Sequence, residues 1–507
     1  MYSKIHTAAL FGIESIGVEV EADVNDGLPV FDMVGFLGTE VKEAREKVRT
    51  ALRNCGYRLP PKRITVNLSP GGIKKSGSGF DLPVAVALLC AMGVIDISLF
   101  NDCIVVGELS LDGRILPVNG VLSIVLKAKK EGFKKCLLPR ANKDEALMVS
   151  DINIYTAETL TEIINFNEMK NETGGKTPKT TGTFCRYDFK DMNGQKGVRR
   201  ACEIAVSGRH NMLMVGPPGS GKSFAARCIP GILPSMNENE MLDVALVYSA
   251  SGDFDKRLNS LYERPYRSPH HTVTAKGLSG GGVVPKPGEI SLANKGVLFL
   301  DELAEYNMNV LETLREPLED KYIKIVRASG TFVFPADFML VAAMNPCSCG
   351  FFPDRNICNC TRTSINRYMG RISQPLLDRI DVTVEAPRLN YREIAEKREN
   401  ESSNDIRKRV DEAVAIQNER YKREEFSFNS EIPAGRMDEF VCLTSKQMVH
   451  MKEMYERLNI SARSYHKILK VARTIADVEG KNDIETVHLN EAICYRSIDK
   501  KEWEKNL

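Results

Sequence analysis

Short, unbroken apolar runs mark the middle of this chain. They cover residues 212–215, 297–300 and 338–344, and each ends at a glycine or a polar residue. Runs of this length without alternation are typical of strands that are buried on both faces of a parallel sheet. Such strands deliver polar residues at their carboxyl ends, where open α/β sheets bind ligands. The pattern therefore predicts an α/β domain with a site at that edge.

The first part of the chain has a different pattern. Residues 64–68 read as a strand, a loop rich in glycine and serine follows, and residues 83–92 predict a helix. Residues 103–110 and 112–116 predict a β-hairpin across a short turn. Together these elements predict a mixed α and β domain over residues 1–165.

Polar and charged stretches divide the rest of the chain. Residues 166–186 are rich in Thr, Gly and Lys and predict an exposed linker, so the α/β core is expected over residues 187–390. Residues 391–425 are strongly charged with sparse apolar positions, which predicts a helical connector. Residues 426–507 predict a C-terminal helical domain.

The first apolar run leads directly into the pattern G-x-x-x-x-G-K-[ST]. Its glycines let backbone N–H groups point at phosphate oxygens, its lysine adds a cation, and its final hydroxyl binds Mg²⁺. A helix expected from Phe224 onward favours the same anion through its dipole. A glycine-rich turn can match by chance, but the context of strand, loop and helix predicts binding and hydrolysis of ATP. The residues are Gly216, Pro217, Pro218, Gly219, Ser220, Gly221, Lys222 and Ser223.

Two acidic residues follow the second apolar run. Asp301 is expected beside Mg²⁺, and Glu302 is the candidate general base that activates the attacking water. An acidic helix N-cap is the plain structural alternative. The phosphate loop elsewhere in the same domain favours the catalytic interpretation.

Three further polar residues resemble the remaining machinery of AAA+ ATPases. Asn345 ends the third run and looks like the polar sensor that bonds the γ-phosphate or the water. Arg379, in the sequence around 375–381, resembles the arginine finger of the magnesium-chelatase and MCM branch, which acts on a neighbouring subunit. Arg463 matches the sensor-2 arginine of the C-terminal region. A turn for Asn345 and surface ion pairs for the arginines are the structural alternatives.

Four cysteines lie close together in the sequence after the third run. Thiolates at this density can close a tetrahedral Zn²⁺ site, in which the metal replaces a core that so short a segment cannot build. The C-x-C spacing is tighter than the usual C-x₂-C, and reduced, unligated thiols are the alternative. We interpret the cluster as a structural zinc site formed by Cys347, Cys349, Cys358 and Cys360.

Composition sets limits on partners and location. The formal net charge of +2 over 507 residues does not indicate a nucleic-acid-binding protein, so any such surface has to be local. No apolar run approaches the roughly 20 residues that span a bilayer, and the first residues lack the apolar core of a signal peptide. We expect a cytoplasmic protein without membrane contact, in which the 13 cysteines are thiols or metal ligands.

The N-terminal region resembles the proteolytic domain of Lon proteases and the related domain of RadA. Lon uses a serine and a lysine, but the matching positions here are Gly79 and Leu122. Ser78 lies one residue away, yet without the lysine no base is available to activate it. The resemblance therefore implies a domain that is not a protease and serves as a scaffold or a nucleic-acid platform.

The whole chain is similar to the ComM/YifB family of magnesium-chelatase-like AAA+ proteins. The most specific segments are residues 264–271, 287–293 and 495–497. The resemblance implies a Lon-like α+β domain, an AAA+ α/β core and a C-terminal helical lid, assembled as a homo-hexamer. It also implies ATP-driven branch migration of DNA during recombination of transforming DNA. The alternatives are a chelatase subunit that inserts Mg²⁺ into a porphyrin and a regulatory ATPase that remodels protein partners.

Two basic segments are candidates for gripping DNA without reading its sequence. Residues 264–286 resemble the helix-2 insert of this AAA+ branch, and residues 321–327 alternate basic with apolar side chains, which predicts a projecting hairpin. The residues alone leave a solvated basic loop equally open, and the family resemblance favours DNA. His270 and His271 in the first segment lack a metal-ligand set and are interpreted as structural. The candidate DNA contacts are Lys276, Lys286, Lys321, Lys324 and Arg327.

Overall fold

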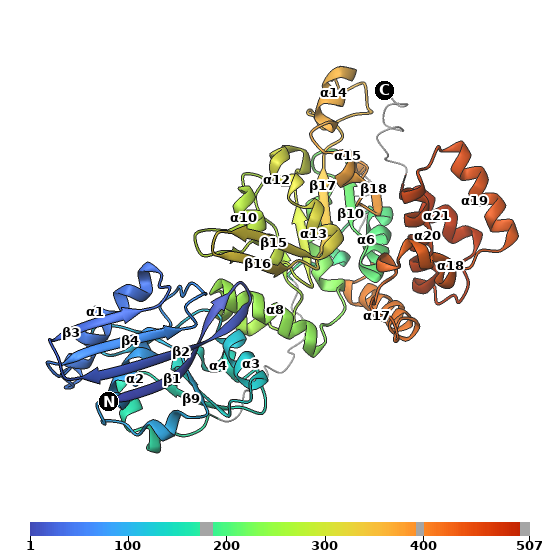
Figure 1. The fold of residues 1–507 in the computed structure, drawn as a ribbon. Helices are drawn as coiled ribbons and strands as arrows, with labels where there is room; N and C mark the ends of the chain where they lie inside the picture. The colour runs from blue at the N-terminus through green and yellow to red at the C-terminus, as the bar shows by residue number, and fades with distance from the viewer. Residues whose placement is uncertain (173–185, 392–399, 497–507) are drawn as a thin grey trace.

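The computed structural model describes residues 1–172, 186–391 and 400–496. Figure 1 shows three regions in a row. The N-terminal domain, in blue to teal, and the C-terminal helices, in orange to red, lie on opposite sides of the central domain. Within the described ranges, no helix is long and apolar enough to cross a membrane.

The N-terminal domain is built on a seven-stranded sheet with the order β3-β4-β2-β1-β5-β8-β9. Strands β1 and β2 form a long antiparallel hairpin, and β5, β8 and β9 run parallel on its far side. Alternation buries Ile64, Val66 and Leu68 of β4, as the sequence predicts. The strands are β1 Tyr2–Phe11, β2 Glu14–Asn25, β3 Val30–Val34, β4 Arg63–Ser69, β5 Cys103–Val105, β8 Lys135–Pro139 and β9 Asn153–Ala157.

Helices complete the core of this domain. The predicted helix at 83–92 is α2, which is buried along nearly its whole length against β1 and β2. Helix α1 buries only one face, through Val41, Ala44 and Val48, and exposes a charged one. The helices are α1 Thr39–Asn54, α2 Asp81–Ala91, α3 Val121–Lys130, α4 Lys143–Ala146 and α5 Leu160–Ile164.

The predicted hairpin at 103–116 is only partly correct. Residues 103–105 form β5 inside the main sheet, because this apolar run is buried on both faces. The hairpin is smaller and pairs β6 (Glu108–Leu109) with β7 (Ile115–Leu116).

The central domain contains a five-stranded sheet with the order β11-β14-β17-β10-β18, and its neighbouring strands pair in parallel. The three predicted buried runs are confirmed as β10, β14 and β17. The strands are β10 Met212–Val215, β11 Tyr266–Arg267, β14 Val297–Leu300, β17 Met339–Met344 and β18 Val382–Glu385, with the hairpins β12 Gly280–Gly281 and β13 Lys286–Pro287, and β15 Tyr322–Arg327 and β16 Gly330–Pro335.

Helices of the central domain cover both faces of the sheet. Residues from its two faces fall into separate apolar clusters, one shared with the C-terminal helices and one lying under hairpin β15–β16. The helices are α6 Lys196–Gly208, α7 Lys222–Cys228, α8 Glu238–Ser251, α9 Phe254–Arg257, α10 Ala275–Ser279, α11 Glu289–Leu292, α12 Met308–Glu312, α13 Arg315–Asp320, α14 Arg362–Met369 and α15 Gln374–Leu377.

The C-terminal helices pack on α6 and share its core. Residues 403–420 of the predicted connector form α17, which buries Ile406, Val410 and Gln417 against α6 and so is part of the packed structure. Residues 392–399 of that connector lie outside the described residues. The helices are α17 Ser403–Arg420, α18 Met437–Phe440, α19 Ser445–Arg457, α20 Ala462–Val478 and α21 Thr486–Cys494.

The predicted linker begins later than residue 166. Phe166 is buried in the N-terminal core, and Glu172 pairs with Ile154 in an isolated β-bridge. The packed part of the domain therefore extends at least to residue 172. Residues 173–185 of the predicted linker lie outside the described residues.

Helix α8 connects the N-terminal and central domains. It packs on α3 in a shared apolar cluster, and the hydroxyl of Ser249 donates a hydrogen bond to Glu145. A second contact stacks Phe11, at the end of β1, on Phe332 of β16 with ring centroids 4.2 Å apart. Hairpin β15–β16 is thereby held against the first domain.

Candidate functional site

The phosphate loop leaves the carboxyl end of β10 and enters α7 at Lys222, two residues earlier than predicted. Gly219 and Gly221 have φ of +75° and +88°. These backbone angles are strained for residues with a Cβ, so the glycines permit the wrapped loop that an anion requires.

Lys222 is buried at the base of this loop. Its Nζ donates to the carbonyl oxygens of Gly216 at 2.7 Å and Pro217 at 2.9 Å, and to Asn345 Oδ1 at 3.3 Å. Burial lowers the pKa of Lys222, while the charge of Asp301 opposes that shift. The ammonium group is thus held inside the loop and within reach of the third strand's polar residue.

Ser223 and Asp301 form the second part of the site. The Ser223 hydroxyl donates to Asp301 Oδ2 at 2.7 Å, which joins the start of α7 to the end of β14. A hydroxyl and a carboxylate are oxygen ligands of the kind that Mg²⁺ takes when it also binds substrate phosphates. The residues present therefore fit a magnesium–nucleotide complex.

Glu302 has a strained backbone and a partner that sequence reasoning missed. Its φ of +54° lies in the left-handed region, which non-glycine residues rarely adopt. Its Oε2 lies 3.7 Å from Nδ1 of His271, whose ring packs on His270 with centroids 4.1 Å apart. The sequence signal for this contact is the histidine pair itself, and the structural role predicted for the pair rests on the lack of a metal-ligand set around it.

Arg379 and Arg463 lie at the opposite edge of the same sheet. They line a cavity of about 580 Å³ together with residues that directly precede the strands, such as Asn211 before β10 and Phe338 before β17. The Arg379 guanidinium forms an ion pair with Glu319 at 2.6 Å. Arg463 is 71% exposed. The structure therefore does not bring either arginine to the chain's own phosphate loop.

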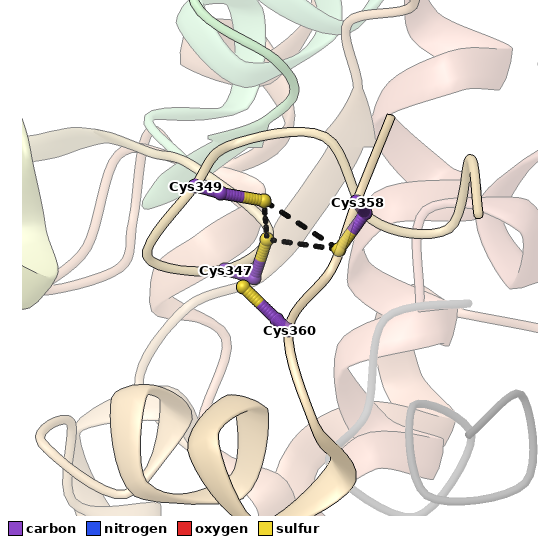
Figure 2. Close-up of side chains that lie close together, drawn as sticks. All are labelled: Cys347, Cys349, Cys358 and Cys360. Atoms are coloured by element: carbon purple, nitrogen blue, oxygen red, sulfur yellow. Dashed lines mark hydrogen bonds between the residues drawn. The ribbon is translucent and has the colours of Figure 1, made fainter. Parts of the chain in front are cut away.

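The four predicted zinc ligands come together on the loop after β17. Their sulfur atoms all lie within 4.8 Å of one another, and Figure 2 shows the Cys347, Cys349 and Cys358 thiols pointing toward each other with Cys360 beside them. The Sγ distances from Cys347 are 3.3 Å to Cys349 and 3.8 Å to Cys358. Cys347 and Cys358 are buried, whereas Cys349 is exposed. Four soft sulfur donors at this separation fit Zn²⁺.

The cysteine loop also contacts the phosphate loop. A Cβ placed on Gly350 would lie 2.5 Å from Cδ of Pro218, and Gly350 has φ of +88°. Only glycine fits this close approach without moving one of the loops.

The predicted DNA contacts separate into two groups. Lys276, Lys286, Lys324 and Arg327 are exposed, and a Cβ placed on Gly281 would lie 3.6 Å from Nη2 of Arg327 and 3.9 Å from Cγ of Lys276. The tip of β12–β13 and the end of hairpin β15–β16 thus lie side by side, with Lys276 near Arg327, while Lys324 lies three residues earlier on β15.

Lys321 does not belong to this group. It lies before β15, as the left-handed C-cap of α13, and its Nζ pairs with Glu431 and lies 3.5 Å from Asp337. Arg264 and Arg267, in the other basic segment, pair with Glu240 at 2.9 Å and Glu289 at 2.6 Å. These three side chains stabilise the fold.

The Lon-like pocket has no serine–lysine pair at the matching positions. Leu122 is fully buried, and a Cβ on Gly79 would lie 3.2 Å from the side chain of Val106. Ser78 donates its hydroxyl to Glu108, which accepts a second hydrogen bond from Lys47 at 2.9 Å. Phe332 of the central domain lines the remaining cavity of about 410 Å³.

Comparisons with known proteins match the chain over nearly its full length. A family model described as magnesium chelatase, subunit ChlI, matches residues 188–394, and models of ChlI subunit regions match 20–142 and 400–496. Competence protein ComM of Haemophilus influenzae is 38% identical over 97% of this chain and 97% of its own length. The chain belongs to the ComM/YifB family of magnesium-chelatase-like AAA+ proteins.

Two further relatives agree with this placement. The YifB protein of Escherichia coli is also 38% identical, over 98% of this chain and 97% of its own length. The peroxisomal Lon protease homolog 2 of Caenorhabditis elegans is 30% identical over 29% of this chain and 20% of its own length. The chain therefore contains a region that is related in sequence to Lon proteases.

Proposed function

We propose that this ComM/YifB family member hydrolyses ATP with Mg²⁺ in a ring of identical subunits and uses the energy to move DNA. The observation that carries the proposal is the division of polar residues between two edges of the central sheet. Lys222, Asp301 and Glu302 lie at the carboxyl edge, whereas Arg379 and Arg463 lie at the amino edge. A ring in which the amino edge of one subunit faces the carboxyl edge of the next joins all five in one site.

The residues at the carboxyl edge divide the chemistry. Lys222 exchanges the loop carbonyls for phosphate oxygens, and Ser223 with Asp301 holds Mg²⁺, which neutralises charge on the phosphates when bound. Glu302 accepts the proton of the attacking water. Asn345, hydrogen-bonded to Lys222, orients that water without adding negative charge.

His271 connects this chemistry to the basic segment. It lies five residues before Lys276 in the sequence, and it contacts the carboxylate of Glu302. We infer that His271 positions Glu302, so that a ligand on the basic segment changes the geometry of the base. This connection gives DNA a route by which it accelerates hydrolysis.

The arginines act on a neighbouring subunit. Arg379 stabilises the charge of the transition state there, and it first has to leave Glu319. Arg463 is largely exposed, and it reaches a neighbour by leaving Asp378, whose carboxylate lies 4.0 Å from its guanidinium. The family resemblance favours six subunits in the ring.

The substrate we propose is branched or single-stranded DNA in the cytoplasm, bound without regard to sequence. Lys276, Lys286, Lys324 and Arg327 form one basic cluster that contacts phosphates. The name of the Haemophilus relative, competence protein, supports a role in natural transformation, and the reaction we propose there is branch migration. The cysteine cluster binds one structural Zn²⁺ beside the ATP site.

ATP hydrolysis with and without a four-way DNA junction tests the proposal. We expect the junction to accelerate hydrolysis and to be migrated, and the double variant Lys324→Ala, Arg327→Ala to lose both responses. Each lost phosphate contact lowers the slope of log affinity against log salt by about 0.9. The control variant Lys446→Ala, Lys452→Ala removes two exposed cations from α19 and should keep both responses.

Two outcomes speak against this function. If the Lys324→Ala, Arg327→Ala variant migrates the DNA junction normally, these two residues do not contact the DNA that is moved. If no DNA changes the ATPase rate of the wild type, the proposal of a DNA motor is contradicted. The chain is then better explained as a chelatase subunit or as an ATPase that remodels proteins.

A further inference from the structure

A cavity of about 340 Å³ opens on the N-terminal domain, on elements that contribute nothing to the nucleotide site. Its walls come from α1, from the edge strand β3 and from the loop before β4. Arg49 and Arg53 lie on the same face of α1 because they are four residues apart, and Arg58 follows that helix. Phe31, Leu59 and Pro60 provide apolar walls.

The chain leaves the charge of these arginines unpaired. All three are exposed, and among the described residues no Asp or Glu side chain lies within ion-pair distance of any of them. Neighbouring cations differ, since Arg45 lies 3.2 Å from Glu46 and Lys62 lies 2.8 Å from Asp26. Like charges around one cavity repel each other, and an anionic ligand relieves that repulsion. The cavity is therefore suited to an anion.

The apolar walls narrow the class of anion. Phe31 lines the cavity and is partly buried against the core of the domain, and Val30, which also lines the cavity, is 44% exposed. A free phosphate makes no favourable contact with apolar walls. An acidic peptide of Asp and Glu carries negative charge but has no aromatic rings to pack against them. Single-stranded nucleic acid brings both, because its bases stack on aromatic side chains while its phosphates contact arginine.

The spacing of the charges agrees with a strand. Arg49 and Arg53 are separated by about 6 Å along the axis of α1, from the rise of 1.5 Å per residue. A row of cations at regular intervals beside an apolar wall tracks a flexible backbone along its length. The neighbouring face of α1 is fixed in the core through Val48 and Leu52, so the helix holds the arginines in a rigid row.

We propose that this cavity is a second DNA contact, separate from the basic cluster of the central domain, and that it takes the backbone and bases of a single strand. The proposal rests on the proposed function, because it assumes that DNA is the ligand of the chain. It adds that the Lon-like domain binds DNA through β3 and the arginine face of α1, and not through the Lon-like pocket that contains Ser78 and Glu108.

The test measures binding of a fluorescent single-stranded oligonucleotide to the full chain at several salt concentrations. For the variant Arg49→Ala, Arg53→Ala, Arg58→Ala we expect affinity to fall on the order of 100-fold at 0.1 M salt and the salt slope to fall by about 2, from about 0.7 per lost contact. Replacing the same arginines by lysine should preserve the salt slope. Phe31→Leu should weaken binding about 10-fold and leave the salt slope unchanged, because stacking involves no counterion release.

A matched control removes three cations elsewhere on the same domain. Lys129, Lys130 and Lys134 are exposed and lie at the end of α3 and in the turn after it. Their replacement by alanine lowers the net charge of the chain by the same amount. Affinity for the oligonucleotide should stay within about 5-fold of the wild type, because only the weaker, long-range electrostatic attraction to DNA is lost. A circular dichroism melt confirms that each variant is folded.

The outcomes separate this inference from the function on which it rests. If the wild type binds the oligonucleotide and the arginine variant binds equally well, the cavity is not a DNA contact and the motor proposal stands. If the wild type binds no DNA, both proposals fall. If poly-glutamate binds the wild type and competes away the oligonucleotide, and Phe31→Leu changes neither affinity, the surface accepts acidic protein and the DNA assignment is overturned.

Discussion

Replacing Cys347 by serine should empty the proposed zinc site. With Zn–S bonds of about 2.3 Å, a tetrahedral site separates its sulfurs by about 3.8 Å. The structure already has 3.3 Å, 3.5 Å and 3.8 Å among Cys347, Cys349 and Cys358, and no pair in the cluster exceeds 4.8 Å. The sulfurs therefore need to move by no more than about 1 Å to close the site around the metal. We expect the wild type to carry one Zn²⁺ per chain and the variant to carry close to none.

The size of the stability effect follows from the loop that the metal closes. Closing a loop of about 15 residues removes about 3 kcal/mol of entropy from the unfolded chain. The unfolding temperature of the central domain should then fall by about 6–12 °C, taking about 2–4 °C for each kcal/mol in a domain of this size. The serine hydroxyl adds to the loss because Cys347 is fully buried.

Metal analysis of reduced protein and calorimetry measure these two effects. Cys442→Ser is the control, since Cys442 is exposed and distant in sequence from the cluster. The reasoning is refuted if the wild type contains no zinc, its four loop thiols titrate freely in the native state, and Cys347→Ser melts at the same temperature as the control.

The remaining predictions concern the ATP site. Lys222→Ala should abolish nucleotide binding, whereas Glu302→Gln should keep binding and lower turnover about 10²–10⁴-fold, as expected for loss of a general base; equal loss of binding in both variants contradicts the division of roles. Arg379→Ala subunits should lower the turnover of mixed rings in proportion to the interfaces they enter, with about 10³-fold lost at each, and wild-type monomers that hydrolyse at the full rate would remove the trans role. His271→Ala should lower turnover about 10-fold without changing nucleotide affinity, while His270→Ala, which does not contact Glu302, serves as its control; a loss of affinity in His271→Ala would mean that the histidine supports the fold instead.

The buried strands of the central sheet were predictable because each consists of consecutive apolar residues. Residues 297–300 and their neighbours in the sheet need no information from elsewhere in the chain. The same rule, applied fully to residues 103–105, places them in a buried parallel strand, whereas the predicted hairpin extends β6 and β7 backward over them.

Contacts between distant segments were not predictable. Lys321 looks like the first basic residue of an alternating strand, but its partner Glu431 lies 110 positions further on, and no local pattern announces that pair. His271 and Glu302 are likewise joined only by the packing of β11 beside β14. Sequence patterns therefore predict the candidate catalytic and binding residues well. They do not predict the distant residues whose contacts hold those side chains in position.

The approach of Gly350 to Pro218 has a consequence for how such chains change during evolution. Any side chain at position 350 has to displace the proline, and the proline belongs to the loop that we propose binds phosphate. The two loops are therefore constrained to vary together, although more than 130 positions separate them in the sequence. A homologue that has lost its cysteines can replace Gly350 only if the backbone there leaves the left-handed region and position 218 has a smaller residue, so these changes should appear together.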